Sequence, residues 1–150
     1  EVVLIATTNL FKSLDKALAR RFDTVISFNE YEKEDLIKIA ELLLDKYISS
    51  YPNIRKNKRL FNKILNVSEH IPYPGELKNI IKTAVAFSDI SNPYDYLRRL
   101  FYSITEIKDK QIKLEDLKNY GFTVREIEIL TGVSKSNVAK KLKEEKWIIY

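Results

Sequence analysis

The spacing of hydrophobic positions changes along the chain, and the first thirty residues follow a strand-like pattern. Residues 2–6 form a continuous apolar run, VVLIA, and residues 24–28, TVISF, are predicted to alternate in direction, with Val25 on one face and Ile26 and Phe28 on the other. A continuous run is typical of a strand buried on both faces, and alternation is typical of a strand with one buried face. Between them, Asp15 can cap a short helix over 16–20, because its carboxylate accepts from free backbone amides. This segment is therefore predicted to be strand, helix, strand.

From residue 33 onward, apolar residues recur at helical spacing. Positions i, i+3, i+4 and i+7 are apolar over 33–49, which predicts an amphipathic helix. A shorter helix is predicted around 60–65, another over 76–88, and a fourth from Pro93 to residue 105, since proline is favourable at the first helical position. We therefore expect a small bundle of four helices.

The last third of the chain has shorter periodic segments. Residues 106–113 are charged and mixed, and are predicted to form a linker. A short helix is predicted from the spacing of the apolar residues that follow, which are Leu114, Leu117 and Tyr120. Residues 147–150 are apolar and are predicted to form a closing strand.

Two further helices are predicted on either side of Gly132. Thr123 and Glu126 have the spacing of a capping box, which marks the start of a helix. Gly132 is predicted to stop that helix, because glycine adopts the left-handed conformation at little cost. Ser134 can cap the next helix, over 135–144. Helix, glycine-containing turn and helix is the outline of a helix-turn-helix.

Composition narrows the class of protein. With 150 residues, 45% of them hydrophobic and 31% charged, the chain is predicted to be globular, as one domain or two small ones. It has no cysteine and one histidine, His70, so we expect no disulfide and no metal site built from thiolates or histidines. No run approaches ~18 apolar residues, so no membrane span is predicted. We expect a cytoplasmic protein.

The net charge of +5 is concentrated in two basic runs. One covers residues 55–63 and is predicted to be a charged loop between helices. The other covers residues 135–143, where four lysines occur without an acidic residue.

The first segment resembles a known family. IATTN followed by LDKALARRFDTVISF closely resembles the sensor 1 strand and the second region of homology of AAA+ ATPases. In that family the asparagine at the strand tip positions the attacking water near the γ-phosphate, which implicates Asn9. The arginines that end the next helix reach into a neighbouring subunit's ATP, which implicates Arg20 and Arg21 as arginine fingers. Such a finger accelerates phosphoryl transfer by ~10³ or more.

Which of the two arginines is the finger stays open, because many members of the family separate them with Pro-Gly. The alternative for the pair is a surface cluster that forms salt bridges with Asp15 or Asp23.

The same resemblance assigns the helices that follow. Residues 1–29 would be the C-terminal end of the AAA+ α/β core, and residues 30–105 would be the helical lid. PYPGELKNIIKTAV matches the lid helix that carries the sensor 2 residue, so Gly75 and Lys78 are the candidate nucleotide-binding residues; the alternative is a solvated Lys78. The resemblance implies ATP and Mg²⁺ in the intact protein, and a homo-oligomeric ring.

Two motifs needed for ATP hydrolysis are missing from the 150 residues. No G-x-x-x-x-G-K-[ST] loop occurs to hold the phosphates, and no hydrophobic strand ends in Asp-Glu. We therefore expect the chain to be the end of a longer one and to be unable to hydrolyse ATP by itself.

REIEILTGVSKSNVAKKL resembles the helix-turn-helix domains of prokaryotic DNA-binding proteins. Glu128 stands where the pattern usually has a small alanine, so a changed distance between the helices is expected. Asparagine can bond adenine bidentately, whereas lysines mostly contact phosphate. The residues that would face the major groove are Lys135, Ser136, Asn137, Lys140 and Lys141. The alternative is a helical domain that packs on the lid or binds a protein.

The combined prediction is a mostly α protein: two strands from the end of an AAA+ sheet, a four-helix lid, and a helix-turn-helix over 106–150 that the closing strand would make winged. The parent protein would couple ATP hydrolysis to remodelling or loading on DNA. Two alternatives stay open. One is a non-enzymatic helix-turn-helix regulator, and the other is a protein-remodelling ATPase whose end domain recruits a protein client.

Overall fold

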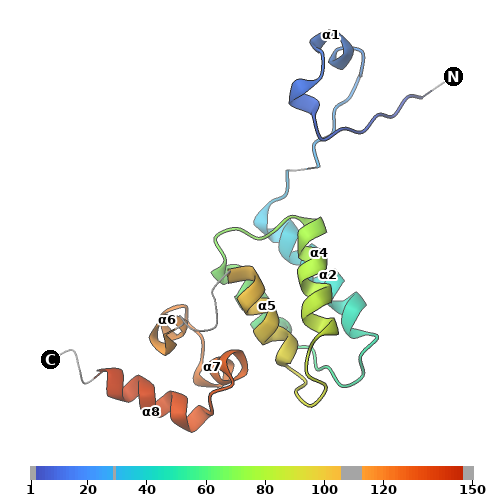
Figure 1. Cartoon of the computed structure of the whole chain (residues 1–150). Coiled ribbons are helices and arrows are strands. Elements are labelled where there is room, and N and C mark those ends of the chain that lie inside the picture. Colours follow the sequence, from blue (N-terminus) through green and yellow to red (C-terminus); the bar gives the residue numbers. More distant parts are fainter. Residues whose placement is uncertain (1–2, 29, 106–112, 147–150) are drawn as a thin grey trace. The chain divides into compact units, whose positions relative to one another are not determined.

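The computed structural model describes residues 3–28, 30–105 and 113–146, with side chains as far as residue 143, and it is mostly helical. The chain divides into two compact units, Glu1–Glu30 and Tyr31–Tyr150 (Figure 1). Each unit is described by itself below.

The first unit contains a 3₁₀ turn, η1 (Phe11–Ser13), and one short helix, α1 (Lys16–Ala19). Asp15 caps α1 as predicted, because its Oδ1 accepts from the backbone N–H of Ala17 at 2.8 Å and of Leu18 at 3.1 Å. The local part of the prediction for this segment is therefore confirmed.

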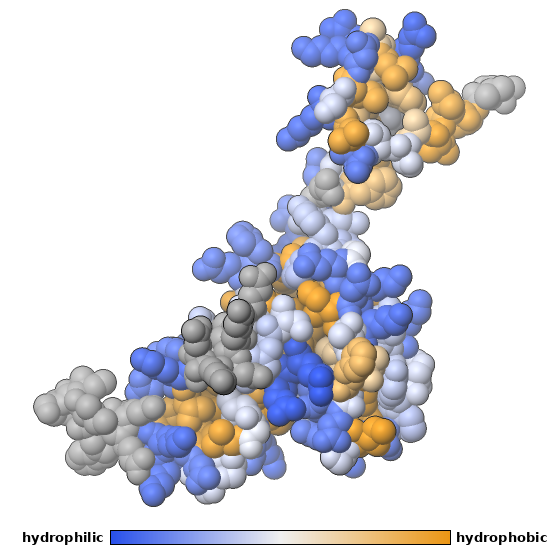
Figure 2. Space-filling model, viewed as in Figure 1, coloured by the Kyte–Doolittle hydropathy of each residue, from blue (hydrophilic) through white to orange (hydrophobic). Residues whose placement is uncertain are grey.

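The two strands predicted for this unit are not found among residues 3–28. A strand exists through hydrogen bonds to a neighbouring strand, and neither apolar segment has such a neighbour in the described part of the chain. Their side chains lie exposed instead: Val3 is 83% exposed and Ile5 is 84% exposed. Figure 2 shows these apolar side chains as orange patches on the surface of the unit.

All the regular elements among the described residues of the second unit are helices, joined by turns and loops (Figure 1). All the predicted helices of this unit are present within a few residues of their expected bounds. They are α2 (Lys33–Ile48), α3 (Lys58–Val67), α4 (Pro74–Ala86), α5 (Asp95–Thr105), α6 (Leu114–Asn119), α7 (Val124–Thr131) and α8 (Lys135–Lys146).

The start of α5 differs from the prediction. The helix begins at Asp95, because Asn92 and Pro93 form a turn before it. The Asn92 side-chain oxygen accepts from Tyr94 N at 3.0 Å, and the Pro93 carbonyl accepts from Arg55 N at 3.1 Å. A side chain that accepts a hydrogen bond from the backbone N–H two residues later favours a turn over a helix.

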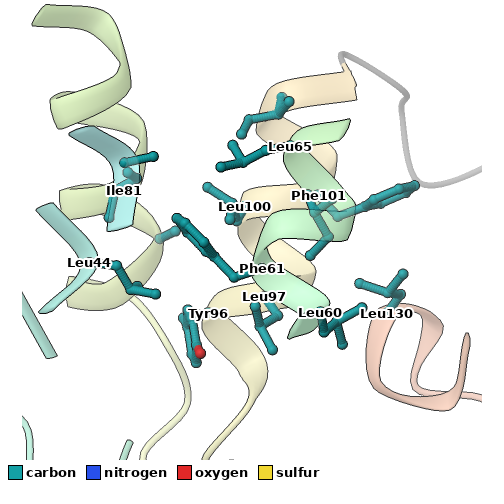
Figure 3. Close-up of a cluster of buried hydrophobic side chains, with 14 of the residues drawn as sticks. Leu44, Leu60, Phe61, Leu65, Ile81, Tyr96, Leu97, Leu100, Phe101 and Leu130 are labelled. Atoms are coloured by element: carbon teal, nitrogen blue, oxygen red, sulfur yellow. The ribbon is translucent and has the colours of Figure 1, made fainter. Parts of the chain in front are cut away.

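One hydrophobic core joins α2–α5 to α6–α8. Figure 3 shows the cluster extending from Leu44 and Ile81, through Phe61 and Leu97, to Leu130 of α7. Leu117, Phe122, Ile127 and Val138 belong to the same buried cluster. The helices on either side of residues 106–112 therefore share one interior.

Two predicted features lie outside the described residues: the linker, except for Lys113, and the closing strand at 147–150. Among the described helices, none combines the length and the apolar content that a membrane crossing requires.

Candidate nucleic-acid interface and nucleotide-contact residues

α7 begins with a complete capping box. Thr123 Oγ1 accepts from Glu126 N at 3.3 Å, and Glu126 Oε2 accepts from Thr123 N at 2.8 Å. The helix ends at Gly132, which has φ +73° in the left-handed region and donates its N–H to the Glu128 carbonyl at 2.9 Å. Both predicted boundaries of α7 are confirmed, because each depends on chemistry that is local in sequence.

Glu128 connects α7 to the start of α8. Its Oε1 accepts from Lys135 N at 2.9 Å, so a carboxylate from the preceding helix satisfies a free amide at the start of α8. Ser134, which the sequence predicted as this cap, instead has its hydroxyl 3.2 Å from Ser136 Oγ. The larger residue at position 128 thus acts as a cap.

α8 presents an exposed basic surface, and one turn of it is anchored in the core. Val138 is fully buried and Leu142 is half-buried. The five residues predicted to face DNA are all exposed: Lys135, Ser136, Asn137, Lys140 and Lys141. Lys135, Lys141 and Lys143 form no ion pair with any described residue. Their charges are therefore not neutralised within this part of the chain.

Lys63 belongs to the basic run at 55–63, but it is not a solvated loop residue as predicted. It lies on α3, and its Nζ donates to the Gly121 carbonyl at 2.7 Å and to Glu126 Oε2 at 2.9 Å. The same ammonium lies 5.0 Å from the centre of the Phe122 ring, within cation–π range. Lys63 therefore ties α3 to the capping box of α7.

This contact affects the ionisation of Glu126. Burial opposes the charged form, but the hydrogen bond from Thr123 N and the contact with Lys63 outweigh it. The pKa of the Glu126 carboxyl is consequently held below its usual value.

The first turn of α5 carries an acidic and basic cluster that the sequence prediction missed. Asp95 is only 1% exposed, and its Oδ2 accepts from Arg99 Nε at 2.7 Å and from Asp89 N at 2.9 Å. Arg98 Nη2 lies 2.6 Å from Asp95 Oδ1. Burial raises the pKa of Asp95, yet these donors and charges lower it further, so the net shift is downward.

The two arginine heads border an open cleft of about 520 Å³ whose lining residues are Arg98, Arg99, Tyr102 and Thr131. In Figure 2, hydrophilic side chains gather in the middle of this unit, over the place that α5 occupies in Figure 1. The spacing i, i+3, i+4 of one aspartate and two arginines was the available signal in the sequence.

In the first unit, Arg20 and Arg21 follow α1 and both are exposed. Neither forms an ion pair with any described residue, so the alternative of salt bridges to Asp15 or Asp23 is not found there. Asn9 is exposed and makes no hydrogen bond to either arginine in the described residues.

Gly75 and Lys78 lie in the first two turns of α4, and both are exposed. Lys78 forms no ion pair with the described residues. A Cβ added at Gly75 would meet nothing within 4 Å, so packing does not require glycine there. Within the described residues, no group of three or more His, Cys, Asp or Glu side chains could hold a metal ion.

Comparisons of the chain with protein-family models, with curated proteins and with solved structures give no match. A functional assignment must therefore be argued from the residues of this chain.

Proposed function

We propose that the chain is the C-terminal part of an AAA+ ATPase that acts on DNA, with α8 as the helix that enters the major groove. The observation that carries the DNA-binding part is the exposed surface of α8 over residues 135–143, which has four lysines and no acidic residue and follows the left-handed turn at Gly132 after α7. Resemblance of the first thirty residues to sensor 1 and the arginine-finger region supports the ATPase part.

The chemistry of α8 fits double-stranded DNA better than a protein client. The major groove of B-DNA is wide enough for an α-helix, and Asn137 has the amide that pairs bidentately with adenine. Lys140 and Lys141 would contact backbone phosphates, and these contacts release counterions from the DNA. A surface that bound a protein core would be expected to expose aromatic or aliphatic anchors rather than lysines.

Titration of this chain with duplex DNA at several salt concentrations tests the DNA-binding part. The double variant Lys140→Gln/Lys141→Gln should lower the slope of log K against log salt by about 1.8, or about 0.9 for each lost phosphate contact. The matched control is Lys46→Gln/Lys82→Gln, which removes two exposed lysines from α2 and α4 and should leave the slope unchanged. A parent chain without salt-dependent affinity would refute DNA binding and favour the protein-client alternative.

The nucleotide role rests on a second observation: the guanidinium groups of Arg20 and Arg21 are exposed and have no ion-pair partner among the described residues. One of them would reach the ATP of the neighbouring subunit in a homo-oligomeric ring. Asn9 would orient the attacking water, and Lys78, beside Gly75, would contact phosphate. Mg²⁺ would be bound by the phosphates of the nucleotide together with one or two carboxylates of the intact protein.

Alanine substitution of each arginine in the intact ATPase tests this role. Loss of the finger should reduce hydrolysis by ~10³ and leave ATP binding intact. Lys12→Ala is the control, because Lys12 is exposed in the same unit and has no described partner. An intact protein that does not hydrolyse ATP would refute the ATPase part and favour the non-enzymatic regulator.

A further inference from the structure

We infer that the cleft beside α5 binds a phosphate of the DNA backbone through Arg98 and Arg99, which would extend the DNA-binding surface from α8 onto the four-helix bundle; the inference rests on the proposed function. Nothing in the sequence prediction assigned a role to these two arginines. They lie in the same compact unit as α8.

The buried carboxylate of Asp95 holds both arginine heads at the surface. Its side chain is 1% exposed, whereas those of Arg98 and Arg99 are 40% and 42% exposed. Two guanidinium groups against the Asp95 carboxylate leave a charge of +1 among these three side chains, and the exposed carboxylate of Asp89 also interacts with Arg98. A cation that is already oriented loses less conformational entropy when it binds an anion.

Most of the donors in the cluster are unused. Among the described residues, Arg99 donates its Nε–H to Asp95, and neither of its terminal NH₂ groups has an acceptor there. Arg98 forms an ion pair with Asp95 but no hydrogen bond in the described part of the chain, consistent with Oδ1 of Asp95 having no hydrogen-bond partner there. Planar groups with free parallel donors are well suited to phosphate oxygens.

The cleft lies directly before α8. Thr131 is one of its lining residues, and a Cβ added at Gly132 would lie 3.8 Å from Arg98 Nη1. The Arg98 head therefore lies close to the turn that leads into the proposed recognition helix. Contacts of this kind set the register of a helix in the groove and carry no sequence information themselves.

DNA binding by the full chain at several salt concentrations tests the inference. Arg98→Gln and Arg99→Gln should each lower the salt slope by about 0.9 for each lost phosphate contact, and should weaken binding roughly 5- to 10-fold near 0.1 M salt. The effect should be the same for every DNA sequence, whereas Asn137→Ala should change sequence preference. Arg98→Lys keeps the charge and should restore part of the affinity.

Either single variant could lose stability, because it removes a partner from a buried carboxylate. The triple variant Asp95→Asn/Arg98→Gln/Arg99→Gln removes that charge as well, and should lower the slope by about 1.8, the sum of the two single losses, while keeping a cooperative thermal transition. Lys46→Gln, on α2, is the single-charge control and should bind as the parent does.

Three results would overturn the inference. A parent that binds DNA with a slope unchanged in the arginine variants would refute the role of the cleft and leave the proposed function in place. A parent without salt-dependent binding would refute both. Displacement of DNA by ATP or inorganic phosphate at constant ionic strength, in the parent but not in the triple variant, would assign the cleft to free phosphate instead.

Discussion

The two units of this protein differ in how far their apolar side chains are exposed to solvent. In the first unit Val3 and Ile5 are more than four-fifths exposed, and in the second unit Phe61 and Leu100 are almost fully buried. Both units have clear hydrophobic patterns in the sequence, but only the second contains the partners that its pattern requires. A hydrophobic pattern therefore predicts which side chains need a partner, and burial depends on where that partner lies.

The sharpest test of this contrast compares one side chain from each unit. Phe61→Ala should lower the free energy of unfolding of the second unit by about 3–5 kcal/mol, because it leaves a cavity at the centre of the core. Ile5→Ala should leave it unchanged. Denaturant unfolding followed by circular dichroism measures both. A large loss of unfolding free energy in Ile5→Ala would show that the Ile5 side chain is buried in solution.

A smaller effect is expected where the helices of the second unit are joined by polar contacts. Lys63→Met should cost roughly 2 kcal/mol, because two hydrogen bonds from the charged ammonium are lost and the buried Glu126 carboxylate keeps no counterion. Lys46→Met is the control, as an exposed lysine without a partner. Equal stabilities of the two variants in thermal unfolding would contradict the structural role of Lys63.

The free energy of unfolding at acidic pH should also depend on the contact between Lys63 and Glu126. The pKa of Glu126 is lowered in the folded state, so its contribution is complete above the usual carboxyl pKa and is lost as pH falls through the lowered value. The stability difference between the parent and Glu126→Gln should therefore shrink as the solution becomes more acidic. A difference that stays constant down to pH 2 would contradict the lowered pKa.

The smallest effect is expected at the start of α8. Glu128→Ala, which restores the more usual residue, should cost about 1 kcal/mol, because the Lys135 amide loses its acceptor. Glu128→Gln keeps a side-chain oxygen in reach and should cost less. Urea unfolding distinguishes the two, and an alanine variant as stable as the parent would show that water replaces the cap at no cost.

The features that were predicted correctly depend on interactions between residues that are close in the sequence. The periodic helices, the Asp15 cap, the Thr123–Glu126 box and the left-handed Gly132 each depend on residues within one or two turns. The start of α5 was predicted at Pro93 and was wrong, because an equally local signal, the Asn92 side chain, was overlooked.

Contacts between distant residues account for what the sequence could not predict. Lys63 and Glu126 are 63 positions apart, and no spacing rule joins them. The Asp95 cluster had a recognisable spacing, but its burial depends on how α5 packs against α4 and α7. The strands of the first unit could not be established either, since strand pairing requires a neighbour that the described residues do not contain.

The Lys63 contact has a mechanical consequence. Because the core is continuous from α2 to α8, and Lys63 joins α3 to the capping box of α7, α8 could not move away from α2–α5 without breaking these contacts.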